Sequence, residues 1–230
     1  MKKKYLIVAA HPDDETLGCG GLIYSLIRKK NDVRVIFLGE GSSCRFSNND
    51  NKELINKEIE KRQRFCLNAL KILRVKKFHF YNLKCGMFDQ ISILKITKII
   101  EEEIQRFKPD VLLTHSINDL HKDHQLSFQA SLQATRPGTR NSVKELLSFE
   151  ILSASEKNFE KIFAPNYFFE LDKVSIEKKI KALKCYKSEI GKHPFSRSAL
   201  NIKSLALYRG SQAGTYYAEA FKIIRLIKTK

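Results

Sequence analysis

The stretch Tyr5-Leu-Ile-Val-Ala-Ala10, followed by His11-Pro12-Asp13-Asp14-Glu15, governs the interpretation of the whole sequence. Six consecutive apolar residues predict a strand that is buried on both faces, as strands of parallel sheets are. The sequence becomes polar and acidic directly where this strand ends. We therefore expect a functional loop at the carboxyl end of a first strand over residues 5–10, and then a helix over residues 17–30.

Strand-like and helix-like segments continue to alternate through the first 135 residues. The apolar pattern predicts three further strands, over residues 33–38, 78–81 and 111–114, and three further helices, over residues 52–73, 92–107 and 125–135. Such alternation is typical of right-handed βαβ crossovers. It predicts an α/β fold, Rossmann-like and doubly wound, with a mostly parallel sheet and helices on both faces.

The second half of the chain has a less regular pattern. Strands are predicted over residues 147–152 and 167–171, a helix over residues 175–187, and a strand or a helix over residues 218–226. The sequence has no internal repeat, low-complexity tract or linker-like segment. We therefore expect one domain that spans residues 1–230.

Composition indicates a globular protein: apolar residues make up 43% and charged residues 29%. No apolar run approaches the ~20 residues that a membrane-spanning helix needs. The apolar run near the N-terminus is also shorter than the core of a signal peptide. The five cysteines are an odd number without paired spacing, which favours reduced thiols. Together these features predict a cytoplasmic protein.

The formal net charge of +17 is unusual and has two interpretations. It can reflect a lysine-rich solvated surface, or attraction to a polyanion, an anionic membrane face or a phosphate-bearing substrate. A basic binding module without turnover is therefore the alternative class of function. The basic runs lack interleaved aromatics and recognisable nucleic-acid motifs, so no nucleic-acid partner is expected.

Two polar clusters each follow a predicted strand. The first is His11–Glu15, and the second is His121-Lys122-Asp123-His124, after the strand over residues 111–114. In a doubly wound sheet the first and fourth strands are neighbours where the strand order reverses, and sites form beyond their carboxyl ends. The two clusters are therefore expected to meet in space.

Their residue types suit a catalytic zinc site, which takes three nitrogen or oxygen ligands and keeps one open position. His11 and Asp14 can point the same way, and His124 would be the third ligand. Asp13 diverges from its neighbour Asp14, which leaves it free to act as a base. Asp123 would orient a histidine through its other nitrogen. The alternative is a helix N-cap for the first cluster and a surface turn for the second.

At these residues the chain resembles the PIG-L/LmbE-like deacetylase family, whose signatures match residues 10–15 and 121–124. Residues 15–21 fit the family's extension of the first motif, and residues 135–137 and 208–212 resemble a bacterial, polysaccharide-associated subgroup, so the resemblance covers nearly the whole chain. It implies a hydrolase that removes an N-acetyl group from an amino sugar. The substrate would be an N-acetylglucosamine-type conjugate, a nucleotide sugar or a glycolipid precursor. An amidase for a larger N-acyl group is the alternative.

The resemblance also implies roles for individual residues. It assigns Zn²⁺, with Fe²⁺ as an alternative ion, to the three ligands named above, and general base catalysis to Asp13. His121 would stabilise the oxyanion or act as the general acid, and we expect it to be protonated. The resemblance suggests substrate binding by four residues: Arg45, Asp89, Arg197 and Arg209. The two later arginines could instead brace the fold through ion pairs. His115, at a strand end, is expected at most to support the site.

One departure concerns the loop after the third strand, where the family often carries an acidic residue for substrate hydroxyls. This chain has Cys85 there, and Asp89 is the acid nearby. The departure bears on which sugar is bound more than on the reaction. The expected partner is a small amino-sugar substrate that can carry negative charge. Peripheral contact with a membrane and assembly into a homo-oligomer are left open.

Overall fold

The computed structural model describes residues 2–47, 50–138 and 143–228. In this part of the chain the strands are β1 (Lys4–Ala9), β2 (Asp32–Gly39), β3 (Lys77–Leu83), β4 (Val111–Thr114), β5 (Glu145–Phe149), β6 (Tyr167–Leu171) and β7 (Tyr217–Leu226). The α-helices are α1 (Asp14–Arg28), α2 (Lys52–Leu73), α3 (Ile93–Phe107), α4 (Lys122–Ala134), α5 (Lys173–Leu183) and α6 (Ala199–Ala213). Three short 3₁₀ helices are η1 (Ser43–Arg45), η2 (Phe88–Gln90) and η3 (Ser155–Lys157).

All these strands form one sheet in the order β3-β2-β1-β4-β5-β7-β6. The five strands from β3 to β5 are parallel, whereas β7 runs antiparallel between β5 and β6. The order reverses between β1 and β4, which pair directly, Tyr5 beside Val111. The predicted doubly wound, mostly parallel α/β fold is therefore confirmed.

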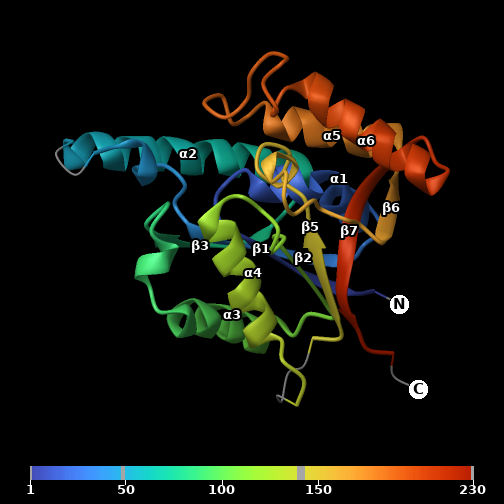
Figure 1. The fold of residues 1–230 in the computed structure, drawn as a ribbon, viewed down its shortest axis with the longest axis horizontal. Coiled ribbons are helices and arrows are strands. Elements are labelled where there is room, and N and C mark those ends of the chain that lie inside the picture. The colour runs from blue at the N-terminus through green and yellow to red at the C-terminus, as the bar shows by residue number, and fades with distance from the viewer. Residues whose placement is uncertain (1, 48–49, 139–142, 229–230) are drawn as a thin grey trace.

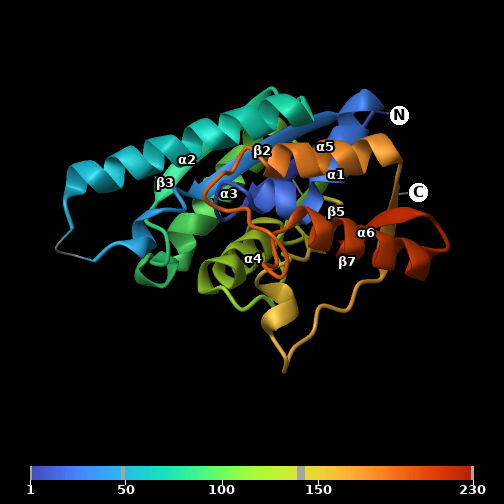
Figure 2. The ribbon, with the colours of Figure 1, turned by 90° about the horizontal axis from the view of Figure 1, so that it is seen from above.

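Helices cover both faces of the sheet (Figure 1). Helices α1, α2, α5 and α6 lie on one face, seen from above in Figure 2, and α3 and α4 lie on the other. Alternate residues of β1 enter the two cores: Ile7 packs in the core beneath the four helices, and Leu6 and Val8 pack in the core beneath α3. Burial on both faces is the reason that the first strand is apolar without alternation.

Helix α1 is kinked at Cys19, where φ is −149° and the backbone is not helical. Directly after the kink, the carboxylate of Glu219 on β7 accepts hydrogen bonds from the N–H groups of Gly21 (3.0 Å) and Leu22 (2.7 Å). Lys179 Nζ lies 2.6 Å from the same carboxylate, and both side chains are about 95% buried. A Cβ atom on Gly21 would lie 2.5 Å from Leu171, so glycine permits this close packing.

Some predicted boundaries are wrong. Helix α4 begins at Lys122, three residues earlier than expected, because His121 caps it. Strand β5 ends at Phe149 instead of residue 152, and α5 ends at Leu183 instead of residue 187. The ambiguous segment 218–226 is strand β7, and helix α6 was not predicted. In the part of the chain that the structure describes, no helix has the length and apolar character required to cross a bilayer.

Candidate functional site

The loop between β1 and α1 separates the two adjacent aspartates. Asp13, just before the helix, has a left-handed backbone (φ 119°), which is rare for a residue other than glycine. Asp14 begins the helix, and its Oδ2 accepts the N–H of His11 at 2.7 Å. This turn directs the Asp14 carboxylate toward the imidazoles of the site, while the Asp13 carboxylate reaches arginine side chains.

His11, Asp14 and His124 lie together at the switch point of the sheet. Asp14 Oδ2 is 3.6 Å from His11 Nδ1 and 3.4 Å from His124 Nε2. One ligand atom from each residue lies within 4.8 Å of the others, and all three residues are buried. The two polar clusters thus meet as the topology predicts, because β1 and β4 are neighbours.

The second nitrogen of His11 is held by Asp123. Asp123 Oδ2 is 2.9 Å from His11 Nε2, which leaves Nδ1 facing Asp14. The carboxylate is itself fixed, since it accepts the N–H of Gly86 at 2.7 Å and the N–H of Phe88 at 3.2 Å. Asp123 therefore has the contact expected of a residue that orients a histidine.

Asp119 makes the equivalent contact with His124. Its Oδ2 is 3.1 Å from His124 Nδ1, and the same carboxylate accepts hydrogen bonds from Ser155 Oγ (3.0 Å) and the His121 N–H (2.9 Å). Sequence reasoning missed Asp119. A signal was available, because Asp119 is an acidic residue only two positions before His121, directly ahead of the recognised motif.

This cluster stabilises a positive charge. Burial alone would raise the pKa of Asp14, but the nearby imidazoles of His124, His115 and His11 hold it well below its usual range. Burial opposes a charge on His124, yet the carboxylates of Asp14 and Asp119 raise its pKa to about 10. Two imidazole nitrogens and one carboxylate match the donor set of a divalent transition metal. The second ring nitrogen of each histidine faces a carboxylate, from Asp123 or Asp119, as is common for histidines that bind a metal.

His115 belongs to the wall of this cluster. Its Nε2 accepts the N–H of Ala10 at 2.8 Å and lies 3.4 Å from Asp14 Oδ2. Burial, followed by the positive charge of His124, lowers the pKa of His115 well below its usual value. A neutral imidazole that is engaged by the backbone supports the loop, as the sequence suggested.

Asp13 faces two guanidinium groups. Arg62 Nη2 is 3.0 Å from Asp13 Oδ1, and Arg197 Nη1 is 2.8 Å from Oδ2. Burial raises the pKa of Asp13 to about 6, although Arg62 and Arg197 act in the opposite direction. A carboxylate with a pKa near neutrality can take and return a proton.

Glu189 joins the arginines into a network. Its carboxylate is 2.6 Å from Arg62 Nη1, 2.7 Å from Arg45 Nη2 and 2.9 Å from Arg197 Nη1. Burial would raise its pKa, but Arg62 and Arg45 lower it to about 2. Sequence reasoning missed Arg62 and Glu189, because nothing in their local patterns distinguishes them from the many other charged residues.

His121 caps α4, and its Nδ1 accepts the N–H of Asp123 at 3.1 Å. Burial, followed by the charge on His124, lowers the pKa of His121 to about 4. The expectation of a protonated His121 is therefore wrong: the ring is neutral, because its Nδ1 is an acceptor. A neutral ring of this tautomer keeps its Nε2–H as a donor.

A cavity of about 150 Å³ opens beside these groups. Its lining includes Asp14, Arg45, Arg62, His121, His124 and Arg197. Two of the candidate metal ligands, Asp14 and His124, therefore share one cavity with two of the arginines expected to bind substrate. The exposed Arg45 lies on η1, in the loop after β2.

Asp89 and Arg209 are not at this cavity. Asp89 is exposed on η2 because Phe88 takes the buried position of that turn. Its carboxylate accepts a hydrogen bond from the Gln90 side chain at 3.2 Å. Arg209 donates to both oxygens of Glu150, at 2.8 and 2.6 Å. Neither residue is retained as substrate-binding, and Arg209 instead braces α6 against the segment after β5.

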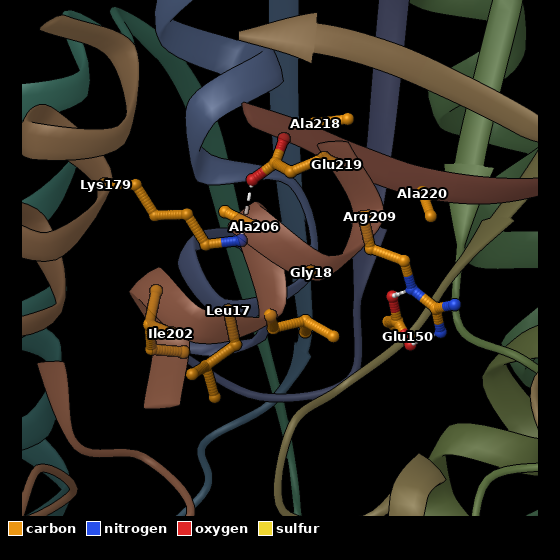
Figure 3. Close-up of a pocket in the computed structure, with 11 residues that line it drawn as sticks. Leu17, Gly18, Glu150, Lys179, Ile202, Ala206, Arg209, Ala218, Glu219 and Ala220 are labelled. Carbon is orange, nitrogen blue, oxygen red and sulfur yellow. Dashed lines mark hydrogen bonds and ion pairs between the residues drawn. The ribbon is translucent and has the colours of Figure 1, made fainter. Parts of the chain in front are cut away.

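Figure 3 shows Arg209 turned toward Glu150, and Lys179 turned toward Glu219, around a second cavity. This cavity measures only about 10 Å³, space for about one water molecule. It cannot take a sugar.

The chain is similar to known proteins in sequence and in fold. The family model of PIG-L, described as GlcNAc-PI de-N-acetylase, matches residues 6–135. Diacetylchitobiose deacetylase from Thermococcus kodakarensis is 26% identical over 96% of this chain and 83% of that protein.

Two solved structures share the fold. N,N'-diacetylchitobiose deacetylase from Pyrococcus horikoshii has a TM-score of 0.78 at 18% identity, over 97% of this chain and 84% of that chain. GalB from Pseudomonas putida, a 4-carboxy-2-hydroxymuconate hydratase, has a TM-score of 0.75 at 21% identity, over 100% of this chain and 99% of that chain. Since a hydratase shares it, the fold alone does not define the reaction.

Proposed function

Because this chain belongs to the PIG-L family, we propose that it hydrolyses the N-acetyl group of an amino sugar, with a divalent metal ion held by His11, Asp14 and His124. Zn²⁺ is the ion we propose first, with Fe²⁺ as the alternative. The observation that carries the proposal is the arrangement of these three donors, each histidine held from behind by a carboxylate. A bound ion of this kind lowers the pKa of water and polarises a carbonyl group.

Asp13 is proposed as the general base. Its carboxylate diverges from Asp14, so it is free of the metal donor set, and its raised pKa of about 6 suits proton transfer near neutral pH. Arg62 and Arg197 fix both of its oxygens. Asp13 would take a proton from the attacking water and deliver it to the departing amine.

His121 is proposed to stabilise the oxyanion that develops on the acetyl oxygen. Its Nδ1 is engaged by the backbone, so Nε2–H is the group that can donate into the cavity. A donor of this kind contributes about 2.7–4 kcal/mol in comparable sites. The neutral ring serves as a hydrogen-bond donor and leaves the acid step to Asp13.

An N-acetylated sugar is the proposed substrate class. The names of the deacetylases from Thermococcus and Pyrococcus specify diacetylchitobiose, an N-acetylated sugar. Arg45 and Arg197 line the cavity and are proposed to contact the substrate, through hydroxyls or an anionic group. We further propose that residues 1–230 act as one domain, because Arg197 completes a cavity that begins with Asp14.

Acetate release from N-acetyl sugars, nucleotide sugars and lipid-linked sugars tests the reaction. Asp13→Asn should retain the metal but lose about 10²–10⁴-fold in rate, because the base is removed. Asp14→Asn should lose metal as well as activity. An Asp13→Asn protein that loses metal, beside an active Asp14→Asn protein, would mean that the two roles are reversed.

A further inference from the structure

Two cysteines meet at the edge of the cavity that contains the proposed metal site. Cys44 Sγ on η1 lies 3.1 Å from Cys85 Sγ, in the loop after β3, and both residues line the cavity. Cys44 is exposed, whereas Cys85 is buried. The two loops touch closely: a Cβ on Gly86 would lie 3.1 Å from the Cβ of Cys44.

We propose that Cys44 and Cys85 are an oxidative modification site, at which peroxide produces a disulfide that slows the enzyme. The loss of turnover rests on the proposed deacetylase function, whereas formation of the disulfide does not. A disulfide bond measures about 2.05 Å, so the sulfur atoms need to approach by only about 1 Å.

Exposure and charge favour Cys44 as the thiol that reacts first. The hydrogen bond with Cys85, together with the positive charge of Arg45, outweighs burial and lowers the pKa of Cys44 to about 7. Thiolates, not thiols, attack peroxides. Of the other cysteines, Cys19 and Cys66 are buried and Cys185 is only partly exposed.

The chemistry balances with hydrogen peroxide as the oxidant. The Cys44 thiolate attacks one peroxide oxygen, the O–O bond breaks, and the departing hydroxide takes a proton to become water. The sulfenic acid on Cys44 is then attacked by the Cys85 sulfur, which forms the S–S bond and expels a second water. Two thiols and one peroxide thus give one disulfide and two waters.

The bond would disturb the support of a proposed metal ligand. The Cys85 N–H donates to Glu40 Oε1 at 2.7 Å, and the next N–H, from Gly86, donates to Asp123 Oδ2 at 2.7 Å. Asp123 in turn holds His11. Movement of Cys85 toward Cys44 would pull on this turn and narrow the cavity.

The test treats the full-length, metal-loaded protein with increasing hydrogen peroxide. Intact mass should fall by two hydrogen atoms, peptide mapping should show a Cys44–Cys85 link, and acetate release should fall about tenfold or more. A thiol reductant should restore both mass and activity. Cys44→Ser should not form the link, and Cys185→Ser, the matched control, should behave as the unmodified chain.

Three outcomes would overturn the proposal. The first is that peroxide oxidises Cys185 while Cys44 and Cys85 stay reduced. The second is a Cys44 oxidised to sulfinic acid without a link. The third is a mapped Cys44–Cys85 link with unchanged acetate release, which would remove its control of turnover. A wild-type protein that releases no acetate before oxidation would instead contradict the proposed function, and the mass and mapping results would still decide the modification.

Discussion

Replacing Asp119 with asparagine should weaken metal binding although Asp119 is not among the proposed ligands. Asp119 uses both oxygens: Oδ1 accepts the His121 N–H, and Oδ2 serves Ser155 Oγ and His124 Nδ1. Asparagine has the same size but only one acceptor oxygen, so at least one of these donors would face an NH₂ group. Loss of such an outer contact typically costs 10–100-fold in metal affinity, about 1.4–2.7 kcal/mol.

The affinity of Asp119→Asn for Zn²⁺ can be measured by competition with a chromophoric chelator, with circular dichroism to verify folding. Asp89→Asn is the matched control, because this exposed aspartate interacts with Gln90 and not with the histidines. It should bind Zn²⁺ as the unmodified chain does. Equal affinity in both variants would refute the view that Asp119 orients His124.

Three further predictions address the base, the fold and the charge. Asp13 acts as a base only when ionised, and its pKa is raised to about 6, so kcat/KM should fall about tenfold per unit as pH drops below about 6; a profile that stays flat from pH 7 to 5 would contradict this. Lys179→Met should lower the free energy of unfolding in urea by about 3 kcal/mol, the lower end of the cost of breaking a buried ion pair, because Glu219 keeps two backbone hydrogen bonds. The control Lys57→Met, at an exposed ion pair, should cost under about 0.5 kcal/mol. Equal losses in the two variants would contradict a stabilising role for the buried Lys179–Glu219 pair. For an anionic substrate KM should rise with salt while kcat changes little, whereas an equal response from a neutral sugar would leave the basic surface without a role in capture.

The sequence predicted the sheet and the meeting of the two polar clusters because both depend on local patterns. A strand buried on both faces must be apolar, and parallel topology brings the carboxyl ends of β1 and β4 together. The donors His11, Asp14 and His124 lie beside these strand ends. Their convergence therefore required only strand order and direction.

The network around Asp13 could not be predicted in this way. Arg62 is in the middle of a long helix and Glu189 follows α5, so only the tertiary packing brings both to the site. Helix α6 was missed because its apolar residues do not form one stripe, and Leu200, Leu207 and Tyr208 are exposed. Arg209 looked available for a ligand because its partner, Glu150, is distant in sequence.

The hydrogen bonds that Glu219 accepts from the backbone after the kink of α1 have a consequence for the order of folding. Gly21 and Glu219 are 198 positions apart, and β7 inserts between two strands that are synthesised before it. Contacts of such long sequence separation form late, since a large loop must close first. On the ribosome, Gly21 and Leu22 of α1 would leave the exit tunnel early but gain their contact with Glu219 only after β7 emerges. The packed junction of α1, α5 and β7, where Glu219 also meets Lys179, would therefore be among the last parts of the fold to form.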